Sequence, residues 1–295
     1  MADISVGSRT KSRSYAQMIF RRFLSHRLAV VGAVVVIALC LSAIFAQSIS
    51  PHDPLQIDTL RRFLPPLASW EYPLGTDELG RDTLSRLLYG GQVSLIVGIV
   101  AMITTMITGT LVGLAAGYYG GIVDNLLMRL VDTLLCFPQI FLLLVIAAFV
   151  PPTILSISLI IGLTSWMEVS RIVRAQVSTI KEMDFVQASR GFGASDWRIM
   201  IVELLPNILA PVLVAATLKV AAAVLMESYI SFLGYGVQPP VASWGNMLTN
   251  AQGYFDTEPY LAILPGILIT LTVMSFNLFG DGLRDAFDAR LKLDP

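Results

Sequence analysis

Three long stretches of this 295-residue sequence contain no charged residue, and they restrict the possible folds more than any other feature. They run from Leu28 to His52, from Leu87 to Val123 and from Thr133 to Met167. A helix needs roughly 20 apolar residues to cross the hydrocarbon core of a bilayer. Only 14% of the residues are charged, against about 25% in an average soluble domain. These features exclude a disordered chain, a coiled coil and an ordinary soluble enzyme, and they predict a membrane protein.

The apolar stretches predict an all-α membrane protein with six transmembrane helices. The stretch from Thr133 to Met167 is too long for one span, because as a helix it measures about 52 Å. Pro151-Pro152 lies inside it, and adjacent prolines end helices. The expected spans are 28–47, 93–117, 126–150, 153–172, 207–232 and 261–279. They form one domain, 28–295, with an extracytoplasmic loop at 48–91 and a cytoplasmic segment at 181–206.

Lysine and arginine predict the orientation. Fifteen of them lie on one side of the membrane, in the segments before the first span, near the start of the third, after the fourth and after the sixth. Four lie on the other side, in the first loop. Because basic residues collect in cytoplasmic loops, both termini are expected in the cytoplasm. Residues 1–27 form the cytoplasmic N-terminus. Within it, 15–27 has one apolar and one basic face, which predicts an amphipathic helix on the inner membrane surface; a disordered basic tail is the alternative.

The cytoplasmic segment 181–206 is long and organised for a loop between spans. Residues 183–190 predict a short helix, and Gly191 and Gly193 supply the freedom for a break in the chain. Ser195 or Asp196 then caps a second helix that leads to Pro206 at the mouth of the fifth span. Two short helices joined by a glycine elbow and anchored to a span could transmit a displacement, imposed by a soluble partner, to the membrane helices.

The same residues resemble a known family. Gln187-Ala188-Ser189, then Gly193, then Leu204-Leu205-Pro206 are similar to the EAA signature of ABC importer permeases, with Gln187 in place of Glu and Ser189 in place of Ala. In that family the segment is the coupling helix, which docks in a cleft of the ATP-binding subunit. The resemblance implies an ATPase-coupling role for Asp184, Gln187, Ala188, Ser189, Gly191, Gly193, Asp196, Leu205 and Pro206.

Further stretches resemble the dipeptide/oligopeptide (and nickel) permease group. Residues 74–90 are similar to its extracytoplasmic signature, 232–247 to the loop between its fifth and sixth spans, and 277–285 to its C-terminal end. The match is to the C-type member of the permease pair. The signature residues are Gly75, Thr76, Asp77, Gly80, Arg81 and Asp82.

The resemblance implies a type I importer permease fold in the bacterial cytoplasmic membrane. The implied partners are a homologous B-type permease, two ATP-binding subunits, an extracytoplasmic solute-binding protein and membrane lipid, with no nucleic acid. This chain is expected to bind no cofactor or metal, because ATP and Mg²⁺ belong to the partner subunits. It contains no phosphate-binding Gly-x-x-x-x-Gly-Lys-Ser/Thr loop and no Gly-x-Ser-x-Gly or His-Glu-x-x-His motif, so no enzyme activity is expected.

Several residues allow two interpretations. Lys219 and Glu227 lie inside a span, where charged residues rarely lack a role; they line the pathway or form structural ion pairs. Gly109, Gly113 and Gly117 share a helix face and allow close packing, either within this chain or against the partner permease. Arg129 and Asp132 are expected to form a local pair.

The expected function is passage of a small peptide into the cytoplasm, driven by ATP hydrolysis on partner subunits. The same architecture could carry nickel, glutathione or an opine. A function of another class, a proton-coupled carrier with Glu227, Asp132 or Lys219 as relay, explains the buried charges but gives the segment 181–206 no role.

Overall fold

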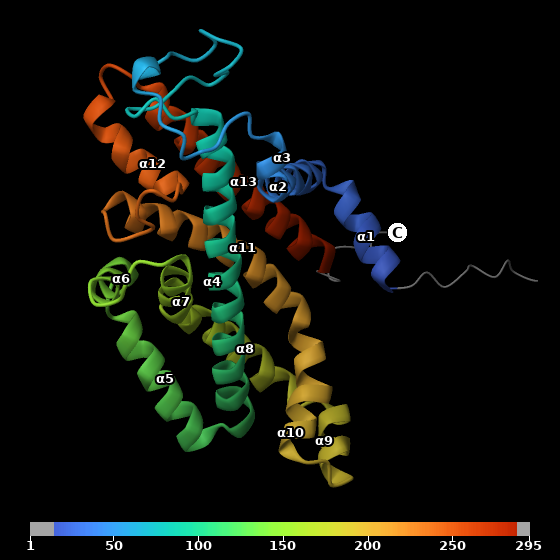
Figure 1. Ribbon diagram of the computed structural model, residues 1–295. Helices are drawn as coiled ribbons and strands as arrows, with labels where there is room; N and C mark the ends of the chain where they lie inside the picture. Colours follow the sequence, from blue (N-terminus) through green and yellow to red (C-terminus); the bar gives the residue numbers. More distant parts are fainter. Residues whose placement is uncertain (1–14, 288–295) are drawn as a thin grey trace, which may run out of the picture.

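The computed structural model describes residues 15–287, and within this range the chain is helical with no β-strand (Figure 1). The first helices are α1 (Tyr15–Ser25), α2 (Arg27–Ile44) and α3 (Ala46–Ile49), followed by a loop with the short helix η1 (Thr59–Arg61). The middle of the chain holds α4 (Thr83–Tyr119), α5 (Gly121–Leu135), α6 (Gln139–Ala147), α7 (Ile154–Leu163), α8 (Trp166–Ile180) and α9 (Asp184–Gly191). The rest holds α10 (Asp196–Arg198), η2 (Ile199–Leu204), α11 (Leu205–Phe232), α12 (Trp244–Ala251), η3 (Gln252–Tyr254) and α13 (Tyr260–Phe287).

Four helices are long and apolar enough to cross a membrane: α2, α4, the continuous helix Asp196–Phe232 and α13. Two bent pairs raise the number to as many as six, if each pair is one span. The pair α5 and α6 bends by 84°, and the pair α7 and α8 bends by 44°. The break at Pro151-Pro152 lies between α6 and α7, as expected.

The structure corrects the shape of three of the expected spans. The span expected at 126–150 is not one rod, because Pro138 has no amide hydrogen and separates α5 from α6. The span expected at 153–172 is bent and continues to Ile180. The span expected at 93–117 is the central part of α4, which already begins at Thr83 because the Asp82 carboxylate caps it. Helix therefore replaces the last part of the loop expected at 48–91.

Helix α4 is the centre of the fold and packs against α7, α8 and α11 (Figure 1). Its glycines permit the close approach of α8. A Cβ atom on Gly109, Gly113 or Gly117 would lie only 2.6–2.8 Å from the Cβ of Val169, Val173 or Val177, respectively. The glycine face is thus filled within this chain. On the other side, α2 packs against α13, and α13 packs against α11.

Figure 1 shows that α9 and α10 lie at one end of the elongated molecule. The loop between α3 and α4 lies at the opposite end, together with α12. Helices α4 and α11 connect these two ends. The two segments singled out by the sequence motifs are therefore separated by the full length of the helical body.

Replacement of Gly113 by leucine is expected to lower the stability of the fold. The added side chain would meet Val173 and the Ser170 carbonyl, and such overpacking costs about 1–3 kcal/mol. Thermal unfolding of the purified protein in detergent measures the effect. Gly266→Leu is the matched control, since no atom lies within 4 Å of a Cβ at Gly266. Equal changes of Tm in both variants would contradict the α4–α8 packing.

Candidate functional site

The segment 181–206, here called the coupling segment, is held against the ends of α4 and α8. Lys181 follows α8 directly and donates a hydrogen bond from Nζ to the Gly117 carbonyl oxygen of α4, 2.9 Å away. Val186 of α9 is completely buried and belongs to an apolar cluster with Leu114 of α4 and Val177 of α8. Helix α9 is therefore fixed to the two helices that pack most closely in the fold.

A glycine elbow joins α9 to α10. Gly193 has φ +80°, a left-handed conformation that favours glycine. The Ser195 hydroxyl accepts a hydrogen bond from the Arg198 amide at 3.4 Å and caps α10. Asp196 accepts a hydrogen bond from the Tyr118 hydroxyl at 2.7 Å, and the Arg190 guanidinium lies over the Tyr118 ring. Both arms of the elbow thus contact the end of α4.

The coupling segment continues into α11 without a break. The chain from Ile199 to Leu204 forms one stretch of π-helix, and Pro206 follows it in the first turn of α11. Leu204 and Ile208 are completely buried in the same apolar cluster as Val186. Helix α9 and the start of α11 therefore pack in one apolar cluster.

The coupling segment exposes large apolar side chains on its surface. Phe192 is 92% exposed at the elbow and Trp197 of α10 is 64% exposed, and Phe185 of α9 is also exposed. Gln187 and Ala188 are exposed on α9, and Ser189 is half-buried, with its hydroxyl 3.5 Å from Glu203 Oε1. The small residues of this segment were predicted from the sequence, whereas Phe185 and Phe192 were not. Their presence in a polar, glycine-containing loop was the available signal.

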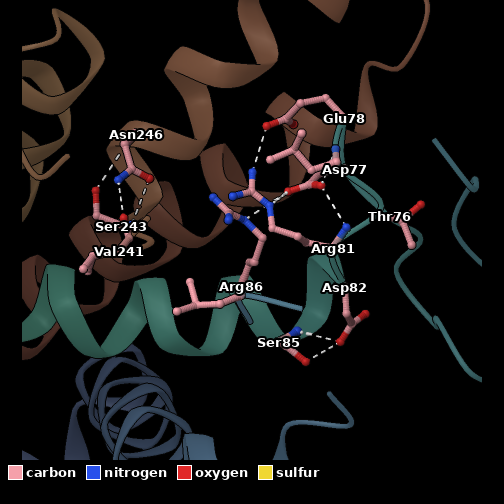
Figure 2. A network of polar contacts seen from close by, with 12 residues as sticks. Thr76, Asp77, Glu78, Arg81, Asp82, Ser85, Arg86, Val241, Ser243 and Asn246 are labelled. Carbon is pink, nitrogen blue, oxygen red and sulfur yellow. Dashed lines mark hydrogen bonds and ion pairs between the residues drawn. The ribbon is translucent and has the colours of Figure 1, made fainter. Parts of the chain in front are cut away.

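The extracytoplasmic signature forms a buried polar network at the other end (Figure 2). Asp77 Oδ2 lies 2.7 Å from Arg81 Nε and 3.3 Å from Arg86 Nε. Arg81 also reaches Glu78 at 2.8 Å. All of the side chains except that of Glu78 are more than nine-tenths buried. The carboxylates face guanidinium groups, so the arrangement is a structural cap on the N-terminal end of α4.

Two glycines and one tyrosine allow this network to pack closely against the neighbouring loop. Gly75 and Gly80 have positive φ, and a Cβ on either would lie about 2 Å from the Leu64 or Asp58 carbonyl oxygen. The Tyr260 hydroxyl of α13 lies within hydrogen-bond distance of the Leu64 and Thr76 carbonyl oxygens. The described residues contain no group of three His, Cys, Asp or Glu side chains suited to a metal ion.

The loop near the cap is also held by a surface ion pair and a ring stack. Arg61 Nη1 donates to Glu71 at 2.5 Å, and this hydrogen bond raises the pKa of the Arg61 guanidinium above its ordinary value. His52 stacks on Tyr72 with ring centroids 4.6 Å apart. Beside them, a cavity of about 730 Å³ opens between the loop and α4. Its polar wall includes Gln56, Tyr89 and Gln92, groups that can hydrogen-bond to amides.

The charged residues expected inside the spans have partners that the sequence did not reveal. Lys219 forms an ion pair with Glu168 of α8. Glu227 is completely buried and accepts hydrogen bonds from two serine hydroxyls. The expected pair between Arg129 and Asp132 is wrong, because Asp132 pairs with Arg171 of α8. Residues on neighbouring helices compete with residues one turn away, and sequence spacing does not show which are nearer.

Comparison with known proteins finds two family models. The model for the binding-protein-dependent transport system inner membrane component matches residues 109–293. The model for the N-terminal TM domain of oligopeptide transport permease C matches residues 14–66.

Curated relatives align over almost the whole chain. The dipeptide transport system permease protein DppC of Haemophilus influenzae is 37% identical, over 92% of this chain and 93% of the relative. The oligopeptide transport system permease protein OppC of Escherichia coli K12 is 40% identical, over 95% and 93%. A putative peptide transport system permease protein of Brucella abortus is 42% identical, over 93% and 92%.

Replacement of Asp77 by asparagine is expected to loosen the outer loop. Two buried guanidinium groups would lose their common carboxylate, and breaking a buried pair costs about 3–5 kcal/mol. Trypsin cleavage at the exposed Arg61 and Arg62 should become faster, and Tm should fall. Asp53→Asn is the control, because Asp53 is exposed and its carboxylate accepts a hydrogen bond from the nearby Leu55 amide without facing a guanidinium group. Unchanged cleavage in Asp77→Asn would contradict the structural role of the cap.

Proposed function

The chain belongs to the family of binding-protein-dependent transport system inner membrane components, and we propose that it is the C-type permease subunit of an ATP-driven importer of small peptides. The family and the long apolar helices make it a multi-pass protein of the bacterial inner membrane. The observation that carries the proposal is the coupling segment. It presents exposed aromatic side chains at one end of the molecule and continues without a break into α11.

The proposed partners each match a part of the chain. Two ATP-binding subunits supply the energy, and one of them receives α9, the elbow and α10. A homologous B-type permease completes the pathway and covers part of the apolar surface of the helices. An extracytoplasmic binding protein delivers the cargo to the end that carries the capped loop and the 730 Å³ cavity. ATP and Mg²⁺ stay on the partner subunits.

The proposed mechanism uses the contacts of the coupling segment. Closure of the ATP-binding subunits on nucleotide displaces α9 and α10. Because Val186, Lys181 and Asp196 tie this segment to α4 and α8, the helices move with it. The same displacement reaches α11 through the π-helical stretch. The reorientation of these helices alternates access to the pathway.

Peptide is the proposed cargo. The relatives at 37–42% identity are named for dipeptide, oligopeptide or peptide transport. These names favour peptides over nickel, glutathione or an opine. The same similarity disfavours the proton-coupled carrier, because relatives of this family act with a binding protein. Both termini are proposed to be cytoplasmic, with α1 lying along the inner membrane surface through Phe20 and Leu24, which are exposed.

A Gly193→Val variant should lose transport and bind the ATP-binding subunits more weakly. A β-branched residue does not tolerate φ +80°, so the elbow would change shape while the spans remain intact. ATP-driven uptake and co-purification of the ATP-binding subunits measure the two effects. Gly253→Val is the control, since Gly253 has open space around it and no positive φ.

Cysteine crosslinking tests the docking directly. A cysteine at Ala188 or Ser189 should crosslink to an ATP-binding subunit in the active complex. The absence of a crosslink at both positions would remove the central claim.

Orientation is tested by a thiol reagent that does not cross membranes. Cysteines placed at Ser69 or Gln238 should be labelled from outside, whereas a cysteine at Ser195 should not. All three positions lie outside the helices that could span the membrane. The outer membrane of the cells is permeabilised and the inner membrane is left intact. Labelling of Ser195→Cys in such cells would place the coupling segment on the wrong side of the inner membrane.

The energy source separates the two classes of transporter. Proteoliposomes with the full complex should take up peptide only when ATP is present on the side of the ATP-binding subunits, and a protonophore should not stop them. Glu227→Gln should be slower but equally dependent on ATP. Uptake by the purified single chain in a pH gradient, lost in Glu227→Gln, would instead establish the carrier.

A further inference from the structure

Glu227 of α11 is an ionisable residue that is buried without an ion pair. Its side chain is 0% exposed, and no lysine, arginine or histidine of residues 15–287 lies within ion-pair distance of it. Instead, Ser94 Oγ of α4 donates to Glu227 Oε2 at 2.9 Å. Ser231 Oγ donates to Glu227 Oε1 at 2.7 Å. The Ser243 hydroxyl is a further hydrogen-bonding partner of this carboxyl group, so serine side chains surround it.

The two serines connect Glu227 to the segment 233–251, here called the outer hairpin, which folds back between α11 and α13. The Trp244 amide donates to Ser94 Oγ at 3.3 Å, and the Val237 amide donates to Ser231 Oγ at 3.2 Å. A hydroxyl has one hydrogen to give. Because each serine accepts a backbone amide of the outer hairpin, its own hydrogen is directed to the carboxyl group.

The outer hairpin is itself rigid. Asn246 donates from its side-chain amide to the Val237 and Val241 carbonyl oxygens, at 3.0 and 2.7 Å, and forms a capping box with Ser243 (Figure 2). The Trp244 indole donates to the Leu87 carbonyl oxygen of α4 at 3.0 Å.

Glycines allow the hairpin to lie directly on the helices. A Cβ on Gly91 would lie 2.7 Å from the Trp244 ring, and one on Gly245 would lie 2.7 Å from the Ser231 side chain. The hairpin is thus one packed body, and its links through Ser94 of α4 and Ser231 of α11 converge on one carboxyl group.

We propose that Glu227 is a positioning residue that fastens the outer hairpin to α4 and α11, so that a displacement of α11 at the coupling segment moves the hairpin with it. The helix from Asp196 to Phe232 is continuous and is about 55 Å long. It carries the coupling segment at one end and Glu227 near the other. The inference that the link transmits motion rests on the proposed function, whereas the link itself does not.

Conservative replacement should preserve part of the link. In Glu227→Gln the amide oxygen still accepts one hydroxyl, but the amide nitrogen faces a serine oxygen that already accepts a backbone amide. In Glu227→Ala both hydroxyls lose their acceptor, and an unpaired buried polar group is costly. The expected order of effect is Glu227→Ala first, then Glu227→Gln and Ser94→Ala.

Distance measurements between spin labels test the link in the assembled complex. Labels are placed at Ile107 of α4 and at Tyr235 of the outer hairpin, both exposed, with Cys40 and Cys136 replaced by alanine. The nucleotide-free complex should give a narrow distance distribution that broadens in Glu227→Ala and less in Glu227→Gln. Ser158→Ala is the matched control, since Ser158 is equally buried but its hydroxyl donates only to the Ile154 carbonyl of its own helix.

The second readout is the amount of ATP hydrolysed per peptide imported. It should rise about fivefold or more in Glu227→Ala, a typical loss of coupling between distant sites, and should stay unchanged in Ser158→Ala.

Should Glu227→Ala fail to assemble, Glu227→Gln and Ser94→Ala carry the same test with smaller expected changes. A distance distribution that is identical in all variants would overturn the link. Broadened distances with unchanged ATP per peptide would overturn its role in transmission. Absence of ATP-driven uptake in the parent complex would refute the proposed function and leave the distance test valid.

Discussion

The close approach of α4 and α8 is the constraint on which the rest of the structure depends. Three glycines remove the side chains that would otherwise hold these helices apart, and three valines fill the space. The approach brings the end of α8 to the end of α4, where Lys181 can reach the Gly117 carbonyl and Tyr118 can reach Asp196. Without it, α9 and α10 would have no fixed platform. The geometry of the coupling segment is thus set by residues that lie outside the segment.

The ion pairs of the molecule differ in how deeply they are buried. In the cap, Asp77, Arg81 and Arg86 are almost completely buried, so separating them would leave unpaired charge and cost several kcal/mol, on the order of 3–5. Between the helices, the pairs Arg171–Asp132 and Lys219–Glu168 each include a side chain that is at least half exposed. Exposed pairs contribute about 0–1 kcal/mol. Rearrangement of these pairs is therefore much cheaper than rearrangement of the cap.

Much of the fold could be predicted from the sequence because membrane spans obey simple length and composition rules. The prolines at 151 and 152 separated two helices as expected, and Gly193 formed the expected elbow. Pro138 was overlooked because the surrounding residues are uniformly apolar, and the resulting bend of 84° depends on tertiary packing.

The partners of the charged residues were the least predictable feature. Asp132 has Arg129 one turn away but pairs with Arg171, and Glu227 pairs with hydroxyls contributed partly by another helix. Such choices depend on how helices are arranged in space. The spacing of residues along one helix does not indicate how the helices are arranged relative to one another.

Continuity of the long helix explains how one chain can join these unlike ends. A π-helical stretch lies at Ile199–Leu204, where the coupling segment meets α11, and π-helical turns often mark functional sites. Beyond it, α11 is α-helical to Phe232 despite Pro211 in its interior. A displacement at the coupling segment can therefore be absorbed partly by the local irregularity, while the remainder is carried along the helix. Since the ion pairs that join α5 to α8 and α8 to α11 are weakly held, these helices can rearrange against one another at low cost, while the cap at the start of α4 keeps its buried charges paired.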